Sequence, residues 1–158
     1  MVIIFQPMVE ARTQTLVCWR YEAPYDIYNL DSLDEQDICY FLEPQNAFYS
    51  ITDQSGDMVG FCSFGPDGQV PGGDYRANAL DIGMGLRPDL TGQGRGLMYV
   101  KAVLDFARRA FAPTAFRVTV AQFNKRALRV WEKAGFRAIQ TFQSQHDGQT
   151  SEAQYLRH

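Results

Sequence analysis

The sequence lacks the features that mark several special classes of protein. Its 158 residues include only three cysteines, Cys18, Cys39 and Cys62, and their odd number and wide spacing fit neither a disulfide framework nor a zinc site. Each cysteine has apolar or aromatic neighbours, so we expect three buried free thiols in a reducing compartment. The chain has no internal repeat, no low-complexity tract and no apolar run that could span a bilayer.

The amino-terminal residues have no basic region ahead of their few apolar side chains, which is not the pattern of a secretory signal. We therefore expect a cytoplasmic protein without a membrane partner. The net charge is −3 and no basic stripe is present, which argues against nucleic acid as a partner. The same acidic balance suits a cationic or amine-bearing partner.

An acidic cluster, Asp34, Glu35 and Asp37, is the arrangement most suggestive of a metal site. It is explained more simply as the start of a helix, with Ser32 and Glu35 forming a capping box and the acids complementing the helix dipole. Pro44 then ends this helix. We accordingly expect no bound metal.

Hydrophobic periodicity predicts one mixed α/β domain spanning residues 1–158, with six or seven strands and about four helices. Asn124 is the expected N-cap of the last helix, and Gly135 lies just beyond its end. The expected strands are residues 2–5, 47–53, 58–65, 80–86, 115–122, 136–145 and 151–158, and the expected helices are residues 9–19, 31–42, 97–111 and 124–134. The final hairpin would turn around residues 146–149.

The most informative stretch is a strand, a glycine-rich turn and a helix over residues 80–111. Apolar residues alternate along the strand, which puts Asp81, Gly83 and Gly85 together on its other face. Gly92, Gly94 and Gly96 follow at intervals of two residues. A helix that starts after such a turn presents unpaired N–H groups and a partial positive charge, and this combination binds anions, most often phosphate.

Two familiar phosphate-binding motifs fit this turn poorly. A Walker A loop needs Gly-Lys-Ser/Thr after its second glycine, whereas the sequence here is Gly94-Arg95-Gly96. A Rossmann fingerprint reads G-x-G-x-x-G near the first strand, whereas this G-x-G-x-G lies in the middle of the chain. An alternative without any ligand is a turn that only lets the helix and the strand pack closely.

Two segments resemble the GNAT superfamily of acetyl-CoA-dependent N-acetyltransferases. "LRPDLTGQGRGLMYVKAVLDFA" resembles the family's pyrophosphate-binding motif, Q/R-x-x-G-x-G/A, at residues 91–96. "AQFNKRALRVWEKAGFRAI" resembles its N-x-x-A-x-x-x-Y-x-x-x-G-F segment at residues 124–136. The segments occur in the family's order and with its separation, over roughly the carboxyl-terminal half of the chain.

The resemblance implies a GNAT-like acyltransferase fold, in which about four helices flank a central, mixed, mostly antiparallel sheet of six or seven strands. It also implies acetyl-CoA as co-substrate. Backbone amides of the glycine turn would bind the pyrophosphate, the strand ending at residue 87 would pair with the pantetheine amides like an added strand, and Asn124 would also reach the pantetheine. The implied cofactor-binding residues are Met84, Leu86, Arg87, Gly92, Gln93, Gly94, Arg95, Gly96, Leu97, Asn124 and Trp131.

The sequence departs from the two family motifs at two positions. Thr91 stands where the family prefers Gln or Arg, and we expect a small loss because the amides do most of the binding. Trp131 stands where many members have the tyrosine thought to protonate the departing thiolate. An indole N–H donates a hydrogen bond but is not a usable acid. We therefore expect Trp131 to form a wall of the thioester tunnel, with water or another hydroxyl as the proton donor.

The acceptor side is less defined. Acyl transfer to an amine needs a base, and Asp81 is our candidate, because Gly83 and Gly85 on the same face would leave an open groove for a substrate. The structural alternative is that Asp81 pairs with a basic residue on an adjacent strand. In the segment that would cover the acceptor site, Tyr25 and Tyr28 are candidate substrate-binding residues, and Glu22 or Asp26 would attract an ammonium group. The alternative is a loop fixed to the core by its aromatic rings.

The predicted function is direct transfer of acetyl from acetyl-CoA to a primary amine on a small molecule or peptide, without a covalent acyl-enzyme. The alternative is a CoA-binding regulatory or interaction module of the same fold that has lost catalysis, which Trp131 in place of tyrosine motivates. A longer acyl-CoA is a further possible donor. Homodimers are common in the family, so we expect that one is possible here.

Overall fold

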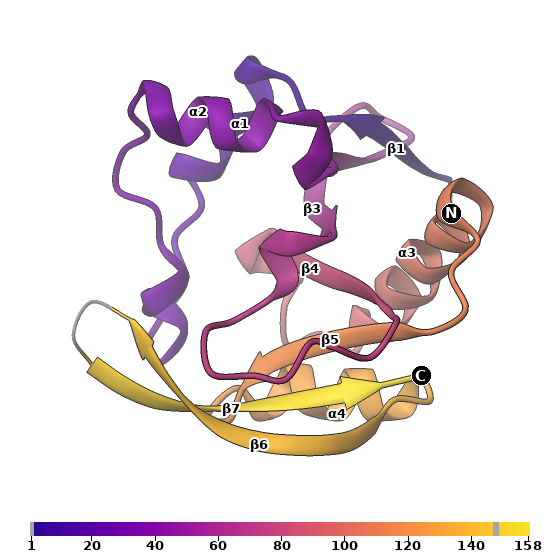
Figure 1. Ribbon diagram of the computed structural model, residues 1–158. Helices are drawn as coiled ribbons and strands as arrows, with labels where there is room; N and C mark the ends of the chain where they lie inside the picture. The colour runs from indigo at the N-terminus through magenta and orange to yellow at the C-terminus, as the bar shows by residue number, and fades with distance from the viewer. Residues whose placement is uncertain (1, 147–148) are drawn as a thin grey trace. The chain divides into compact units, whose positions relative to one another are not determined.

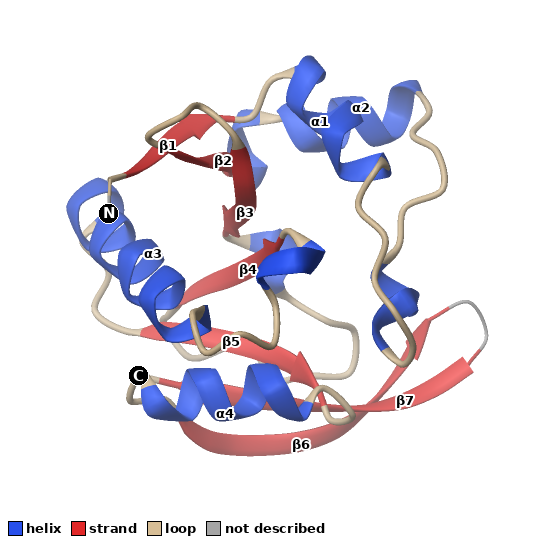
Figure 2. Cartoon of the chain, turned by 180° about the vertical axis from the view of Figure 1, so that it is seen from behind, coloured by secondary structure: helices blue, strands red, loops and turns tan. Residues whose placement is uncertain are grey.

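The computed structural model describes residues 2–146 and 149–158 and divides the chain into two compact units (Figures 1 and 2). The first unit contains the chain up to Ser63 together with Met84–Thr91, and the second contains Phe64–Gly83 and Gly92–His158. The strand β4 (Leu80–Leu86) passes from the second unit into the first. Assignment of the whole chain to a single domain stays a prediction.

The first unit combines antiparallel strands with two short helices. Its strand order is β1-β2-β3-β4, and β1 pairs antiparallel with β2 from Ile3 opposite Asp53. A bulge interrupts the pairing of β2 with β3 between Ile51 and Thr52. The elements are β1 (Ile3–Pro7), α1 (Glu10–Val17), α2 (Glu35–Leu42), β2 (Phe48–Asp53) and β3 (Met58–Phe64), whose last residue belongs to the second unit.

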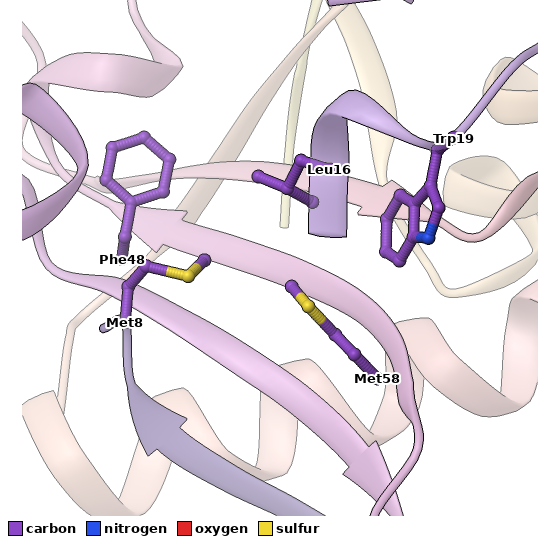
Figure 3. Close-up of a cluster of buried hydrophobic side chains, with 5 residues drawn as sticks. All are labelled: Met8, Leu16, Trp19, Phe48 and Met58. Carbon is purple, nitrogen blue, oxygen red and sulfur yellow. The ribbon is translucent and has the colours of Figure 1, made fainter. Parts of the chain in front are cut away.

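The core of this unit lies between α1, α2 and the strands β2 and β3. Figure 3 shows side chains of α1, β2, β3 and the segments that follow β1 and α1 converging on one cluster, against which Phe41 of α2 packs. Each member of the cluster is at most 7 % exposed, and together they bury the apolar area that stabilises the unit. The members are Met8, Leu16, Trp19, Phe48 and Met58.

The second unit is built on strands in the order β4-β5-β7-β6. Strand β4 pairs with β5 in parallel over Leu80–Ile82, and the other pairs are antiparallel. Helix α4 lies along one face of β6 and β7 in both views (Figures 1 and 2). The remaining elements are α3 (Gly96–Phe111), β5 (Phe116–Ala121), α4 (Lys125–Lys133), β6 (Arg137–His146) and β7 (Gln149–Arg157).

The expected fold class is confirmed: four helices accompany a mixed, mostly antiparallel set of seven strands in the described parts of the chain. The predicted strand 80–86 is observed with the same bounds. Part of the turn predicted for the last hairpin falls on residues 147 and 148, outside the described residues. Short 3-10 turns add Tyr25–Tyr28, Pro44–Asn46, Pro66–Gly68 and Pro88–Leu90.

The capping box expected at Ser32 and Glu35 is wrong by two residues. The N-cap of α2 is Asp34, whose carboxylate accepts from the Asp37 amide at 2.8 Å, while the Asp37 carboxylate accepts from the Asp34 amide. Aspartate caps a helix as well as serine does, and the acidic cluster supplied a better-placed pair. The interpretation of the cluster as a helix start is confirmed.

The expectation for the cysteines holds for one of three. Cys62 is fully buried, whereas Cys18 and Cys39 are exposed, although all three are free thiols. Cys18 is the C-cap residue of α1, and Cys39 lies on the solvent side of α2. Within the described residues, no helix combines the length and the apolar character needed to cross a membrane.

Candidate functional site

Two residues of the glycine turn have a backbone conformation that requires glycine or nearly so. Gly92 and Gly94 have φ angles of +70° and +76°, in the left-handed region that side chains with a Cβ rarely adopt. Gln93 lies between them. The turn leads through Arg95 into α3, the longest helix among the described residues.

The three glycines serve different purposes. A Cβ on Gly96 would lie 3.1 Å from Cγ2 of Val130, so this glycine lets α3 approach α4 closely. A Cβ on Gly94 would meet nothing within 4 Å, so the space beside it is open. The packing alternative therefore explains Gly96 but not Gly94, whose backbone conformation and open surroundings suit a turn that presents its amides outward.

The start of α3 has the character of an anion site. Its N-cap residue, Arg95, makes no side-chain cap, and the first turn contains no acidic residue. The carbonyl of Arg95 accepts from Met98 and Tyr99, whereas the amides of Gly96 and Leu97 belong to the group that has no acceptor within a helix. These amides and the helix dipole favour a negative group.

Helix α4 is capped as expected. The side chain of Asn124 accepts from the Ala127 amide at 3.1 Å, and Gly135 follows the helix with a φ of +104°. Trp131 is 5 % exposed and packs edge-on against Phe136, with ring centroids 5.0 Å apart. The indole is thus part of the packing of this unit, and a contact with the thioester stays a prediction.

Strand β3 is hydrogen-bonded to one edge of β4. The amide of Arg87 donates to the carbonyl of Val59 at 2.9 Å, so the odd-numbered residues of β4 direct their backbone groups toward β3. The groups of Met84 and Leu86 therefore point to the opposite edge, while the pairing of β4 with β5 covers only Leu80–Ile82. Of the three residues expected to pair with pantetheine, Met84 and the amide of Leu86 face this edge, whereas the Leu86 carbonyl accepts from the Tyr21 hydroxyl and the Arg87 amide is occupied.

Side chains around the end of β4 are also engaged. The Arg87 guanidinium pairs with Asp89, and this hydrogen bond holds the pKa of the Asp89 carboxyl below its usual value. The hydroxyl of Thr91 donates to the Pro88 carbonyl at 2.7 Å, within its own turn. The open groove expected beside Gly85 is absent, because a Cβ there would collide with the ring of Phe61.

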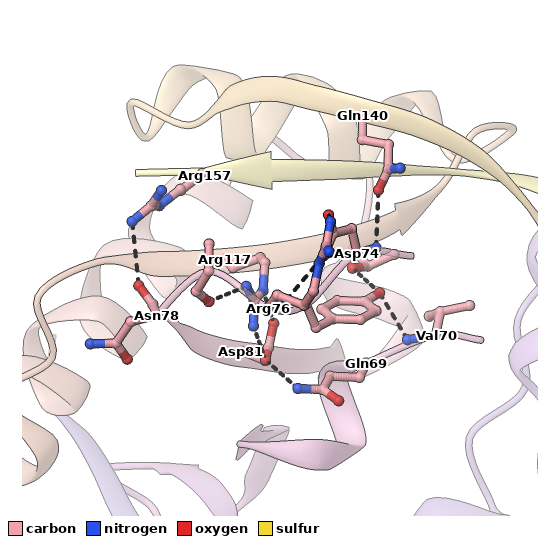
Figure 4. Close-up of polar contacts among 12 residues, drawn as sticks. Gln69, Val70, Asp74, Arg76, Asn78, Asp81, Arg117, Gln140 and Arg157 are labelled. Atoms are coloured by element: carbon pink, nitrogen blue, oxygen red, sulfur yellow. Dashed lines mark hydrogen bonds and ion pairs between the residues drawn. The ribbon is translucent and has the colours of Figure 1, made fainter. Parts of the chain in front are cut away.

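Asp81 lies in a buried ion pair. Its carboxylate accepts from both Nε and Nη2 of Arg117, and the two side chains are 3 % and 2 % exposed (Figure 4). Gln69 donates to the same carboxylate at 3.0 Å, so both oxygens are occupied as acceptors. This is the structural alternative considered above, and it leaves the proposed role of Asp81 as general base without support.

A pocket of about 370 Å³ adjoins this pair. No residue of the glycine turn lines it. The ring of Tyr75 covers the Arg117 guanidinium at 4.9 Å, and its hydroxyl is within 2.8 Å of the Thr119 hydroxyl. The pocket thus borders a satisfied polar network. Its lining residues are Gly65, Pro66, Gln69, Tyr75, Arg76, Ala77, Asn78, Ala79, Leu80, Asp81 and Arg117.

The segment expected over the acceptor side is fixed by polar contacts that sequence reasoning did not foresee. The hydroxyl of Tyr21 donates to the carbonyl of Leu86, and Asn29 accepts from the Tyr21 amide at 2.7 Å. Burial raises the pKa of Tyr21 to about 12, so the hydroxyl stays protonated at neutral pH. A tyrosine in an aromatic segment was the available signal, but its partner lies 65 residues away.

Tyr25 and Tyr28, the predicted substrate-binding residues, lie in the 3-10 turn of this segment. Tyr28 is 43 % exposed and its ring meets the edge of Tyr21, while Tyr25 is half-buried. Glu22 and Asp26 are exposed beside them. The segment therefore displays aromatic surface and two carboxylates together.

Comparison with known proteins identifies the class. The sequence model of the acetyltransferase (GNAT) domain matches residues 6–137, so the chain belongs to the GNAT acetyltransferase family. No curated protein sequence matches it. Within the described residues, no group of three or more His, Cys, Asp or Glu side chains could hold a metal ion.

Solved structures show the same fold at low sequence identity. A chimera of the Vibrio cholerae spermidine N-acetyltransferase SpeG and hSSAT has a TM-score of 0.76 and 14 % identity, over 98 % of this chain and 93 % of that one. A Bordetella pertussis protein assigned as a GNAT-family acetyltransferase has a TM-score of 0.69 and 21 % identity, over 98 % and 94 %. Vibrio cholerae spermidine N-acetyltransferase in complex with CoA and spermine has a TM-score of 0.70 and 14 % identity, over 99 % and 94 %.

Proposed function

We propose that the protein is an N-acetyltransferase that moves acetyl from acetyl-CoA directly to the primary amine of a small molecule. The observation that carries this proposal is the glycine turn. Gly92 and Gly94 have left-handed backbone, and the turn opens into a helix whose first turn has no acidic residue, in a chain of the GNAT family. One of the similar structures is a complex with CoA.

Different residues of the chain bind different parts of acetyl-CoA. Amides of residues 92–97 hold the pyrophosphate, since they have the geometry of an anion site. The outward backbone groups of Met84 and the outward amide of Leu86 pair with the amide groups of pantetheine as a neighbouring strand would, while the Leu86 carbonyl is held by the Tyr21 hydroxyl. Asn124 keeps its helix in place by capping it and offers its amide group to the pantetheine.

The attacking amine is neutral, so an acceptor that arrives as an ammonium first loses a proton to water. Its nitrogen then bonds to the acetyl carbon as the carbon–sulfur bond breaks, and one N–H proton is released while the thiolate leaves. Trp131 does not supply a proton to the sulfur, because the indole N–H is not an acid. A thiol with a pKa near 8.5 leaves as the anion at neutral pH at a cost of about 2 kcal/mol, so turnover does not require an acid from the protein.

The acceptor we propose is a cationic amine. The segment that contains Tyr25 and Tyr28 also presents the exposed carboxylates of Glu22 and Asp26, which attract an ammonium group, while aromatic faces suit its alkyl stem. A similar protein in the solved structures is bound to spermine, an amine of this kind.

Calorimetric titration with acetyl-CoA, with ATP and NAD as controls, tests the cofactor. We expect binding of acetyl-CoA alone and, in hydrogen exchange, protection of the amides of residues 92–97. Equal or absent binding of all three nucleotides would show that the turn is structural. Release of CoA thiol in the presence of an amine panel that includes polyamines then tests the transfer.

A second candidate is a CoA-binding module without catalysis. Two observations favour it. Trp131 stands at the position of the family's tyrosine, and the carboxylate of Asp81 is buried in an ion pair with Arg117. Turnover separates the two proposals. Binding of acetyl-CoA without release of thiol, across the whole amine panel, would support the module and overturn the enzyme.

A further inference from the structure

Arg126 lies over the first glycine of the turn. A Cβ built on Gly92 would be 2.8 Å from Nη1 of Arg126 and 3.9 Å from its Cδ and Cζ. The guanidinium of a half-buried residue in the first turn of α4 therefore rests against the backbone of the glycine turn. Any side chain at position 92 would displace it.

The charged residues at the starts of α3 and α4 are all basic. The first turn of α3 contains no acidic residue, and neither does the first turn of α4. Arg95 is the N-cap residue of α3, and Lys125 precedes Arg126 in α4. A guanidinium from the first turn of α4 thus reaches the turn that leads into the N-terminus of α3, an arrangement that favours an anion.

We propose that Arg126 is a ligand of the pyrophosphate of the CoA group, completing with its side chain a site that the turn builds from amides. This inference rests on the proposed function. A planar guanidinium donates two parallel hydrogen bonds to phosphate oxygens and brings a full positive charge, whereas backbone amides are neutral donors. Arg126 is also a reason for glycine at position 92, because the guanidinium occupies the space of a side chain there.

The matched control is Arg129, in the same helix and with the same charge. Its side chain is exposed and donates to the Lys125 carbonyl at 3.3 Å. In calorimetric titrations with acetyl-CoA, we expect Arg126→Gln to raise the Kd about 10- to 100-fold, as is typical for loss of a charge-assisted hydrogen bond. Arg129→Gln should change the Kd by less than about twofold, since an exposed charge is screened by salt.

Probes that lack parts of the ligand locate the contact. The ratio of Kd values for Arg126→Gln and wild type should be the same with dephospho-CoA as with CoA, and should fall to about one with pantetheine, which has no phosphate. A ratio that falls to one already with dephospho-CoA would overturn the assignment, because Arg126 would then serve the 3′-phosphate. Equal Kd values for both variants and wild type would also overturn it.

Arg126→Lys guards against a folding defect in the glutamine variant. It keeps the charge but loses the planar fork, so its Kd should lie between those of wild type and Arg126→Gln. Equal affinities of the lysine and glutamine variants, both folded by circular dichroism, would contradict ligation by the guanidinium. Failure of the wild-type protein to bind acetyl-CoA would instead refute the proposed function itself.

Discussion

Substitution of Asp81 by asparagine should destabilise the protein rather than only slow a reaction. The neutral amide would leave Arg117, a side chain only 2 % exposed, without its negative partner. Removing one member of a buried ion pair costs about 3–5 kcal/mol, because a buried charge that loses its ion-pair partner is poorly solvated. Burial of both side chains means that solvent screening does not reduce this figure.

Urea unfolding followed by circular dichroism measures the effect. We expect the midpoint for Asp81→Asn to fall with little change in slope. Combining Asp81→Asn with Arg117→Met should recover much of the loss, because the charge is then removed. The control is Asp105→Asn, whose exposed pair with Arg108 contributes at most about 0.5 kcal/mol.

The reasoning would be refuted by an Asp81→Asn protein as stable as wild type. If such a protein bound acetyl-CoA normally and had lost transfer to every amine, Asp81 would be the base after all. If stability falls and the double variant regains both stability and turnover, the role of Asp81 is to compensate the charge of Arg117.

Three further outcomes are expected. Gly92→Ala should weaken acetyl-CoA binding at least tenfold in calorimetry, because a Cβ opposes a φ of +70° and meets the neighbouring guanidinium; unchanged affinity would contradict this. Tyr21→Phe should lower the unfolding free energy by about 1 kcal/mol. This difference should be constant from pH 6 to 9 and shrink between about pH 10 and 12, because burial raises the pKa of Tyr21 to about 12 and the unfolded phenol ionises first. With a thiol reagent at pH 8, Cys18 and Cys39 should react at once and Cys62 only after unfolding, because burial raises the pKa of its thiol.

The sequence predicted best where a local pattern decides the structure. Strict alternation gave the bounds of β4, and an Asn before an amphipathic run ending at Gly135 gave the caps of α4. The turn between β4 and α3 likewise followed from its closely spaced glycines. In each case, the residues that determine the conformation lie within a few positions of one another.

Contacts between distant residues were beyond this kind of reasoning. The partner of Asp81 is 36 residues away and depends on the register of β4 against β5, so the sequence could offer an ion pair only as an alternative. The hydrogen bond from Tyr21 to Leu86 and the position of Arg126 over Gly92 likewise arise from tertiary packing. Cys18 and Cys39 have apolar neighbours in sequence, yet they face solvent because the helical period turns them outward.

The two edges of β4 also bear on how the chain can vary in length. Odd-numbered residues direct backbone groups to β3, even-numbered ones direct them away, and Asp81 must face Arg117. Deletion or insertion of a single residue inside this strand would reverse every one of these assignments at once. The exposed turn around Gly56, between β2 and β3, has no such constraint, so relatives should differ in length there and keep β4 at a constant seven residues.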